Sequence, residues 1–229
     1  MRPYREILLL ASFLLCSCAT EVGYQREYLS EAAPGYMAEA EIVVLMHDHD
    51  LEYVYEGGAD SPIGAASTLT MPIGDIMQEV AARVFQSCFM YGVVFTEELV
   101  PDMRYIIAIE PEIRDFTYRF ERQVEEGLIV VGGPGLEDAS VTSVTPSVQF
   151  ELTVKAYNSS ADLAMEKTYP SGLVSGEKYY ATFRPNERIN ETFHRALQDV
   201  MLAVAEDIRP LLVGKCEITD VSAHKEEGL

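Results

Sequence analysis

The chain has 229 residues and a formal net charge of −20, from 37 acidic and 17 basic residues. This charge disfavours binding to nucleic acids and to anionic lipid headgroups, because both are polyanions. A hydrophobic content of 48 % is enough for the core of one folded domain.

Residues 1–17 have the pattern of an export signal. Arg2 and Arg5 make a basic start, and residues 7–15, ILLLASFLL, form a short apolar run. This run is about half of the roughly 20 residues that a membrane-spanning helix needs. The alternative is a buried N-terminal strand or helix, but the polar, tyrosine-rich stretch that follows offers no matching core. We therefore expect residues 1–17 to be a signal peptide that is removed.

The sequence Leu15-Cys16-Ser17-Cys18 resembles the bacterial lipobox. Cys18 fits the pattern because Ser17 precedes it and aliphatic Leu15 lies at −3, whereas Cys16 would directly follow a bulky leucine. The resemblance implies that Cys18 is lipidated and begins the mature chain, and several acyl chains make detachment from a membrane rare. It further implies, from Ala19 at the following position, an outer-membrane protein that faces the periplasm.

Residues 18–40 are predicted to be the lipidated N-terminus and a tether, because they have no hydrophobic period and contain Pro34 and Gly35. Residues 41–215 are expected to form a single domain, and residues 216–229 a C-terminal tail. Inside the domain, residues 41–55 predict a strand, or a strand that turns back. Residues 71–92 predict a helix, whose first turn Gly74 weakens slightly.

The next segments alternate as strands do. Residues 93–99 and 104–121 are two of them, and Pro111 marks an edge or a bulge in the second. Residues 147–170 predict a hairpin that turns at Asn158. A second helix follows Asn186. The most economical packing is an α+β two-layer sandwich, in which one mainly antiparallel sheet of about five strands carries both helices on one face.

This order of elements behind a lipobox resembles the YajG-type family of bacterial outer-membrane lipoproteins. The resemblance covers residues 40–212 and rests on the leader, on MPIGDIMQEVAARVFQSCFMYGVVF and on YYATFRPNERINETFHRALQDVMLAVAEDI. The lipopolysaccharide-translocon lipoprotein LptE and the penicillin-binding-protein activator LpoB show similar alternations. The family implies no chemistry to transfer, so Cys18 is the one functional residue that carries over.

We find no convincing catalytic set or cofactor motif. His47 and His49 would lie on one face of a strand, about 7 Å apart, but a zinc site needs three or four ligands. We therefore expect acid-paired histidines and no metal. Ser175 and Lys178 have the S-x-x-K spacing of serine acyl-enzymes without the K-T-G that accompanies it. Residues 132–135, GGPG, predict a turn, because no phosphate-loop lysine follows.

Two functions remain open. The first is a non-catalytic scaffold or accessory in a cell-envelope assembly, which binds a protein partner through an open face or edge of its sheet. The alternative is a lipid- or lipopolysaccharide-handling accessory, which would need clustered Lys and Arg for lipid phosphates. The scattered basic residues favour the first. Phe116, Tyr118 and Phe120 share a strand face and are candidates for partner binding, unless they belong to the core. Adjacent carboxylates, such as Glu97 and Glu98, indicate a solvated surface.

Cys88 and Cys216 are the two cysteines left besides the lipidated one. Because the envelope is oxidising, they are candidates for a disulfide. Cys88 also lies on the apolar stripe of the first helix, so it could instead be an ordinary core residue. An antiparallel arrangement of the two helices would keep the two cysteines apart.

Overall fold

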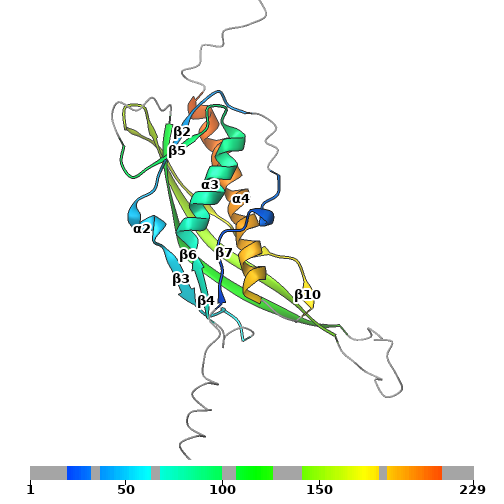
Figure 1. Ribbon diagram of the computed structural model, residues 1–229. Coiled ribbons are helices and arrows are strands. Elements are labelled where there is room, and N and C mark those ends of the chain that lie inside the picture. Colours follow the sequence, from blue (N-terminus) through cyan, green and yellow to red (C-terminus); the bar gives the residue numbers. More distant parts are fainter. Residues whose placement is uncertain are drawn as a thin grey trace, which may run out of the picture.

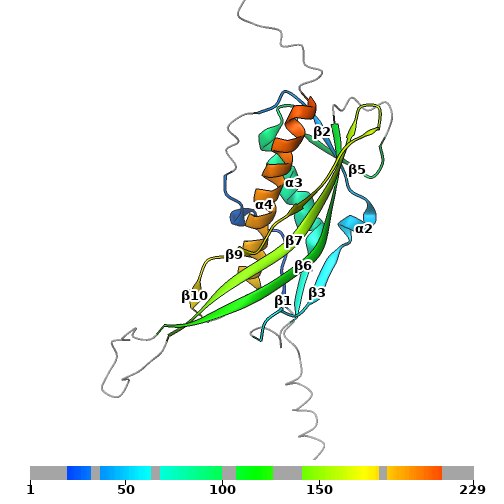
Figure 2. The same cartoon turned by 180° about the vertical axis from the view of Figure 1, so that it is seen from behind.

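The computed structural model describes residues 20–31, 37–62, 68–99, 107–125, 141–180 and 185–212 (Figure 1). In these ranges the chain forms a mixed sheet with two long helices on one face (Figures 1 and 2), so the predicted α+β class is confirmed. The elements in chain order are β1 (Thr20–Glu21), η1 (Arg26–Tyr28), β2 (Ile42–Leu45), α2 (Asp48–Leu51), β3 (Val54–Gly57), β4 (Leu69–Pro72), α3 (Ile73–Cys88), β5 (Val93–Thr96), β6 (Ile107–Glu125), β7 (Val141–Asn158), β8 (Leu163–Pro170), β9 (Val174–Ser175), β10 (Tyr179–Tyr180) and α4 (Pro185–Leu212).

The main sheet has seven strands and mixed directions. Its order is β10-β7-β6-β2-β5, and β8 and β9 also pair with β7. β2 is parallel to both β5 and β6, whereas the β6–β7 and β7–β8 pairs are antiparallel. The prediction of about five strands is therefore wrong in number. Most pairings are antiparallel, as predicted, since β6, β8, β9 and β10 all pair antiparallel with β7, and the parallel pairings of β2 were not predicted. The segment between β2 and β5 ends in α3, which carries the chain back so that β5 runs in the direction of β2.

A second, three-stranded sheet has the order β1-β4-β3 and lies beside the middle of β6. The N–H of Asp60, just after β3, donates to the carbonyl of Tyr118 at 2.7 Å. The hydroxyl of Ser61 accepts from the N–H of Phe120 at 3.0 Å. These bonds fix the small sheet against one stretch of the long strand.

β6 and β7 form a long ribbon that reaches past the ends of the helices (Figures 1 and 2). Pro111 pairs with Val154 in an unbroken part of the ladder, and the register shift lies later, between Arg114 and Thr117. Of the two roles predicted for Pro111, the structure supports the edge. β2 accompanies β6 only as far as Ile109, so one flank of Pro111 has no neighbouring strand to which an N–H would donate.

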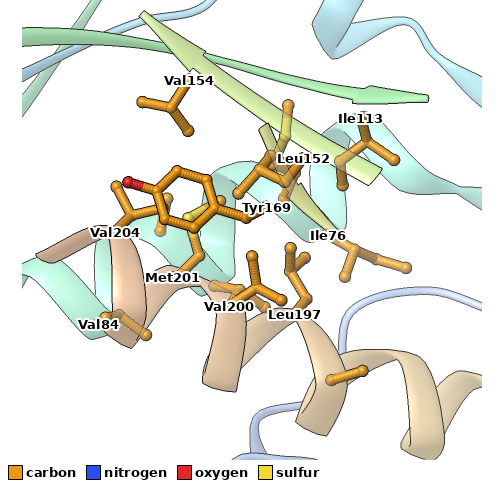
Figure 3. Packing of buried hydrophobic residues seen from close by; sticks show 14 of the residues in the cluster. Ile76, Val84, Ile113, Leu152, Val154, Tyr169, Leu197, Val200, Met201 and Val204 are labelled. Atoms are coloured by element: carbon orange, nitrogen blue, oxygen red, sulfur yellow. The ribbon is translucent and has the colours of Figure 1, made fainter. Parts of the chain in front are cut away.

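The core lies between the main sheet and the two helices. The predicted inward residues of β7 are fully buried; they are Val148, Phe150, Leu152, Val154 and Ala156. Figure 3 shows the ring of Tyr169 between this sheet and α4, close to Met201 and Val204. α3 and α4 run in the same direction, so their C-terminal ends lie at the same end of the molecule (Figure 1).

Candidate functional site: the N-terminal strap

Residues 20–31, here called the strap, lie against the domain. The strap begins as β1, in which Thr20 pairs with Leu69 of β4. It then passes along α4 as far as Ser30, which bonds to Gln198. The prediction of a tether over residues 18–40 is therefore wrong for this part. Val22 joins the core and Tyr24 and Leu29 pack against it, but backbone groups of Gly23, Gln25 and Ser30 bond to polar side chains of α4, and such bonds leave no hydrophobic period.

His194 is the centre of this interface and is fully buried. Its Nε2 accepts a hydrogen bond from the N–H of Gln25 at 3.1 Å, so Nδ1 carries the proton and donates to the carbonyl of Asn190 at 2.8 Å. The rings of Tyr24 and Tyr28 lie next to the imidazole, with centroids 5.6 and 5.5 Å from its own. Burial lowers the pKa of His194 to about 4, which keeps the ring neutral at pH 7.

Two amide side chains of α4 hold the strap on either side of His194. Asn190 donates from Nδ2 to the carbonyl of Gly23 at 2.7 Å. Gln198 bonds twice to the backbone of Ser30: Oε1 accepts from its N–H at 3.1 Å, and Nε2 donates to its carbonyl at 2.9 Å. A buried amide that satisfies both groups of one residue fixes the position of that residue on the helix.

These residues were missed in the sequence, although a signal was present. Asn186, Asn190, His194 and Gln198 follow one another at intervals of four residues, so they lie on one face of α4. All four are uncharged at pH 7 and buried. A row of buried uncharged polar residues next to an apolar stripe predicts that backbone from another segment lies on that helix face.

The two predicted histidines do not lie on a strand. His47 precedes α2 and His49 lies within it, because the chain makes one helical turn between β2 and β3. Their rings stack with centroids 5.5 Å apart. Nε2 of His47 lies 3.8 Å from Oε1 of Glu110, and Nε2 of His49 lies 3.3 Å from Oδ1 of Asp50. Among the described residues, no group of three or more His, Cys, Asp or Glu side chains converges on a point where a metal could bind.

The aromatic stripe of β6 belongs to the core. It is therefore not the exposed partner-binding surface for which the sequence made it a candidate. Phe116, Tyr118 and Phe120 are all less than 6 % exposed. The ring of Phe116 lies 4.7 Å from that of Tyr55 and 5.2 Å from that of Phe193, measured between centroids. The small sheet and α4 therefore cover the stripe that the sequence left open.

The remaining predicted residues lie apart from the strap. Cys18 and Cys216 fall outside the described residues, so lipidation and the disulfide stay predictions. Cys88 is buried at the end of α3 and forms no disulfide with another described residue. Ser175 lies in β9, where its hydroxyl bonds to that of Ser147 at 3.1 Å. No helix of the described part of the chain is both long enough and apolar enough to cross a bilayer.

Comparisons with known proteins give a fold and no activity. No family model matches the sequence, and no curated protein matches it. The structure is similar to that of a Xanthomonas campestris protein of the family DUF330, with a TM-score of 0.50, 12 % identity and coverage of 84 % of this chain and 96 % of the other. At this identity the likeness shows a shared fold alone.

Two further solved structures align at lower scores. A Helicobacter pylori protein described as a homologue of the neuraminyllactose-binding hemagglutinin has a TM-score of 0.39 and 10 % identity, over 78 % of this chain and 90 % of the other. A minor lipoprotein from Acinetobacter baumannii has a TM-score of 0.31 and 10 % identity, over 75 % of this chain and 93 % of the other. Membership of the YajG-type family stays a prediction.

Proposed function

We propose that this protein is a lipid-anchored accessory of a bacterial cell envelope, held at the outer membrane by Cys18, and that it positions a partner protein without catalysing a reaction. The strap is the observation that carries this proposal. It gives the anchored end of the chain a fixed place on the domain, which a scaffold needs and a free tether would not provide.

The distance along the chain is short. Only Ala19 separates Cys18 from Thr20, which already pairs with Leu69. Two residues span at most about 7 Å. The acyl chains therefore begin next to the β1–β4–β3 sheet, and the membrane faces that end of the domain. The opposite end, where α3 and α4 finish, points away from the bilayer.

The charge pattern favours this role over lipid handling. Several basic side chains are already paired with carboxylates: Lys155 with Glu110, Arg114 with Glu112, and Lys167 with Asp207. A lipid phosphate would have to displace these carboxylates. These ion pairs of the described residues favour the accessory role over the lipid-handling alternative, which would need clustered Lys and Arg for lipid phosphates.

The first experiment tests the anchor. The Cys18→Ser variant is expected to take up no radioactive fatty acid. On cell fractionation it is expected to leave the membrane fraction. The Cys16→Ser variant is the matched control and is expected to keep both properties. Loss of lipid in the Cys16 variant instead would show that the lipobox has been assigned to the wrong cysteine.

The second experiment tests the orientation in vesicles that carry an acceptor dye on the lipid headgroup. A fluorescent amino acid at Glu56, in the β1–β4–β3 sheet, should transfer energy more efficiently than one at Tyr91, beyond the end of α3. The double variant Asn190→Ala, Gln198→Ala should reduce the difference, because it releases the strap. Asp199→Asn, on the exposed side of α4, is the control. Equal transfer from both positions in the unmodified strap would contradict a fixed orientation.

A further inference from the structure

We propose that the free edge of β5 and the groove at its end bind an extended segment of a partner protein through a lysine or arginine side chain. This inference rests on the proposed accessory function and adds the surface and the chemistry of the partner. Three features of the described residues lead to it: the outward backbone groups of β5, an edge strand without Lys, Pro or a bulge, and a groove that combines apolar and acidic side chains.

One side of the β5 backbone bonds to β2, and the other side has no neighbouring strand among the described residues. The N–H of Ile42 donates to the carbonyl of Gly92 at 3.2 Å, and the N–H of Met46 donates to that of Thr96 at 3.0 Å. Because strand residues alternate in direction, Val93 and Phe95 turn their N–H and C=O groups away from β2. β5 is the terminal strand of the sheet in the described part of the chain. Two residues therefore offer four groups to an added strand.

Natural edge strands limit strand addition by being very short or by carrying Lys, Pro or a bulge. β5 is short, with four residues, but it carries none of the other three features. β5 has the sequence VVFT, with Val94 41 % exposed, and its pairing with β2 runs without a register shift. By contrast, β8 on the other side of the sheet carries Lys167 and ends at Pro170. The difference indicates that the β5 edge is left available.

A groove of about 510 Å³ lies where β2 and β5 end. It is lined by the apolar residues Met46, Leu51 and Phe95, by the polar residues Gln78 and Thr96, and by Glu97 and Glu98, here called its rim. The two glutamates are exposed.

The hydroxyl of Thr96 helps to fix this rim, because it donates to the carbonyl of Glu98 at 3.0 Å. Apolar walls below two carboxylates suit a side chain with an aliphatic stem and a cationic end, which is the description of lysine and arginine. A second copy of the chain is a poor occupant, since it would bring a second net charge of −20 to the same edge.

The test uses the full mature chain in detergent and a fluorescent heptapeptide, Thr-Lys-Val-Lys-Val-Lys-Thr, in an anisotropy titration. The same peptide with Glu in place of Lys is expected not to bind. The Val93→Pro variant removes one outward N–H and should weaken binding about fivefold, while Val93→Thr keeps that N–H and should bind normally. Hydrogen exchange should slow at the Val93 and Phe95 amides when the peptide is present.

The charge requirement has its own matched control. Glu97→Gln with Glu98→Gln should weaken binding about fivefold, since each exposed ion pair contributes modestly. Glu151→Gln with Glu166→Gln removes the same charge from β7 and β8 and should change little. Equal losses in both double variants, or unchanged binding by Val93→Pro, would overturn the proposal.

Hydrogen exchange of the protein without peptide tests for two other occupants of the edge, which are residues 213–229 of the same chain and a second copy of the chain. If the Val93 and Phe95 amides are already protected without peptide, the edge is taken and the proposal fails. A chain ended after Leu212 then shows whether residues 213–229 occupy it, and sedimentation shows whether a second copy does. Peptide binding is expected to be the same in Cys18→Ser, so a failure of membrane anchoring is read separately from a failure of this inference.

Discussion

The backbone N–H of Gln25 donates to Nε2 of His194, which lies 169 residues later in the chain, at 3.1 Å. This bond requires the neutral ring, because a protonated imidazole has no acceptor. The attachment of the strap to the last helix therefore depends on one buried, uncharged histidine. If His194 were protonated, its Nε2–H and the N–H of Gln25 would both be donors at this contact, and the hydrogen bond would be lost.

We predict that this contact makes the domain sensitive to mild acid. The pKa of His194 is lowered by burial from 6.5 to about 4, and the hydrogen bond to the carbonyl of Asn190 and the charge of Glu27 only partly oppose this shift. The unfolded chain therefore binds a proton first, and stability falls as the pH drops from 6.5 towards 4. Since one pH unit of pKa difference is worth about 1.4 kcal/mol, the loss reaches about 3 kcal/mol. Urea unfolding at a series of pH values measures it.

The comparison of variants isolates this effect from other titrating groups. Glu110 and Asp207 also have lowered pKa values, owing to hydrogen bonds that Tyr157 and Lys167 donate to them. Their protonation at low pH also lowers the stability of the domain. His194→Gln should flatten the slope between pH 6.5 and 5, although it lowers stability at pH 7. A slope that His194→Gln does not change would contradict the prediction.

A second prediction concerns Tyr118. Its ring is buried against those of Tyr55 and Phe120, and its hydroxyl donates to the carbonyl of Gly57 at 3.2 Å. Tyr118→Ala should therefore lower the free energy of unfolding by about 3–5 kcal/mol, the usual size for a buried aromatic truncation. Tyr118→Phe keeps the ring and should cost about 1 kcal/mol, the value of one hydrogen bond. A loss below about 1 kcal/mol in Tyr118→Ala would show that the ring is not part of the core.

A third prediction concerns Gly74 in the first turn of α3. A Cβ at this position would collide with the backbone carbonyls of Asp50 and Leu51 in α2, and the N–H of Gly74 donates to Tyr53 at 3.0 Å. Gly74→Ala gains about 1 kcal/mol in helix propensity. We nevertheless expect a net destabilisation of about 1–3 kcal/mol in urea unfolding, because the helix must move away from α2.

The control for Gly74 is Glu79→Ala, an exposed position of the same helix that should change stability by less than about 0.5 kcal/mol. A more stable Gly74→Ala variant would show that α2 moves aside at little cost. The test matters for the groove proposed above, because Leu51 of α2 forms part of its wall.

The helices, the hairpin at Asn158 and the class of the fold could be predicted, because each is encoded in a local period. The turn illustrates this, since Oδ1 of Asn158 accepts from the N–H groups of Ser160 and Asp162. The parallel pairing of β2 could not be predicted. In β2, Val43 pairs with Val94 of a parallel strand, but the sequence of β2 would look the same beside an antiparallel strand. Strand direction is decided by the connections, and these have no period.

The strap escaped prediction for a related reason. Hydrophobic patterning detects a segment that buries apolar side chains, whereas Gln25 and Ser30 are held through their backbone groups. Gly74 was misread in the same way: as a helix weakness from propensity, when its role is the close approach of α2. In both cases the contact is made with a segment that is remote in sequence: α4 for the strap and α2 for Gly74. The sequence indicates such a contact only on the helix face that takes part in it.

The last prediction concerns Cys88 and Cys216. Because α3 and α4 run in the same direction, the final turns of α4 lie beside Cys88: the pKa of its thiol, raised by burial, also responds to the charges of Arg209 and Glu206. This removes the antiparallel arrangement that would have kept the cysteines apart. Cys216 lies four residues beyond Leu212, and four residues reach at most about 14 Å.

We therefore expect the two thiols to be joined in exported protein, provided that their Cα atoms come within about 7 Å. Thiol counting on denatured, unreduced protein should find no free thiol, and reduction should lower the free energy of unfolding by about 4–5 kcal/mol, the chain-entropy value for so long a loop. Cys88→Ser should expose one thiol at Cys216 and make the unfolding curve insensitive to reductant. Two free thiols in the unmodified protein would rule the bond out and leave Cys88 as a core residue at the end of α3.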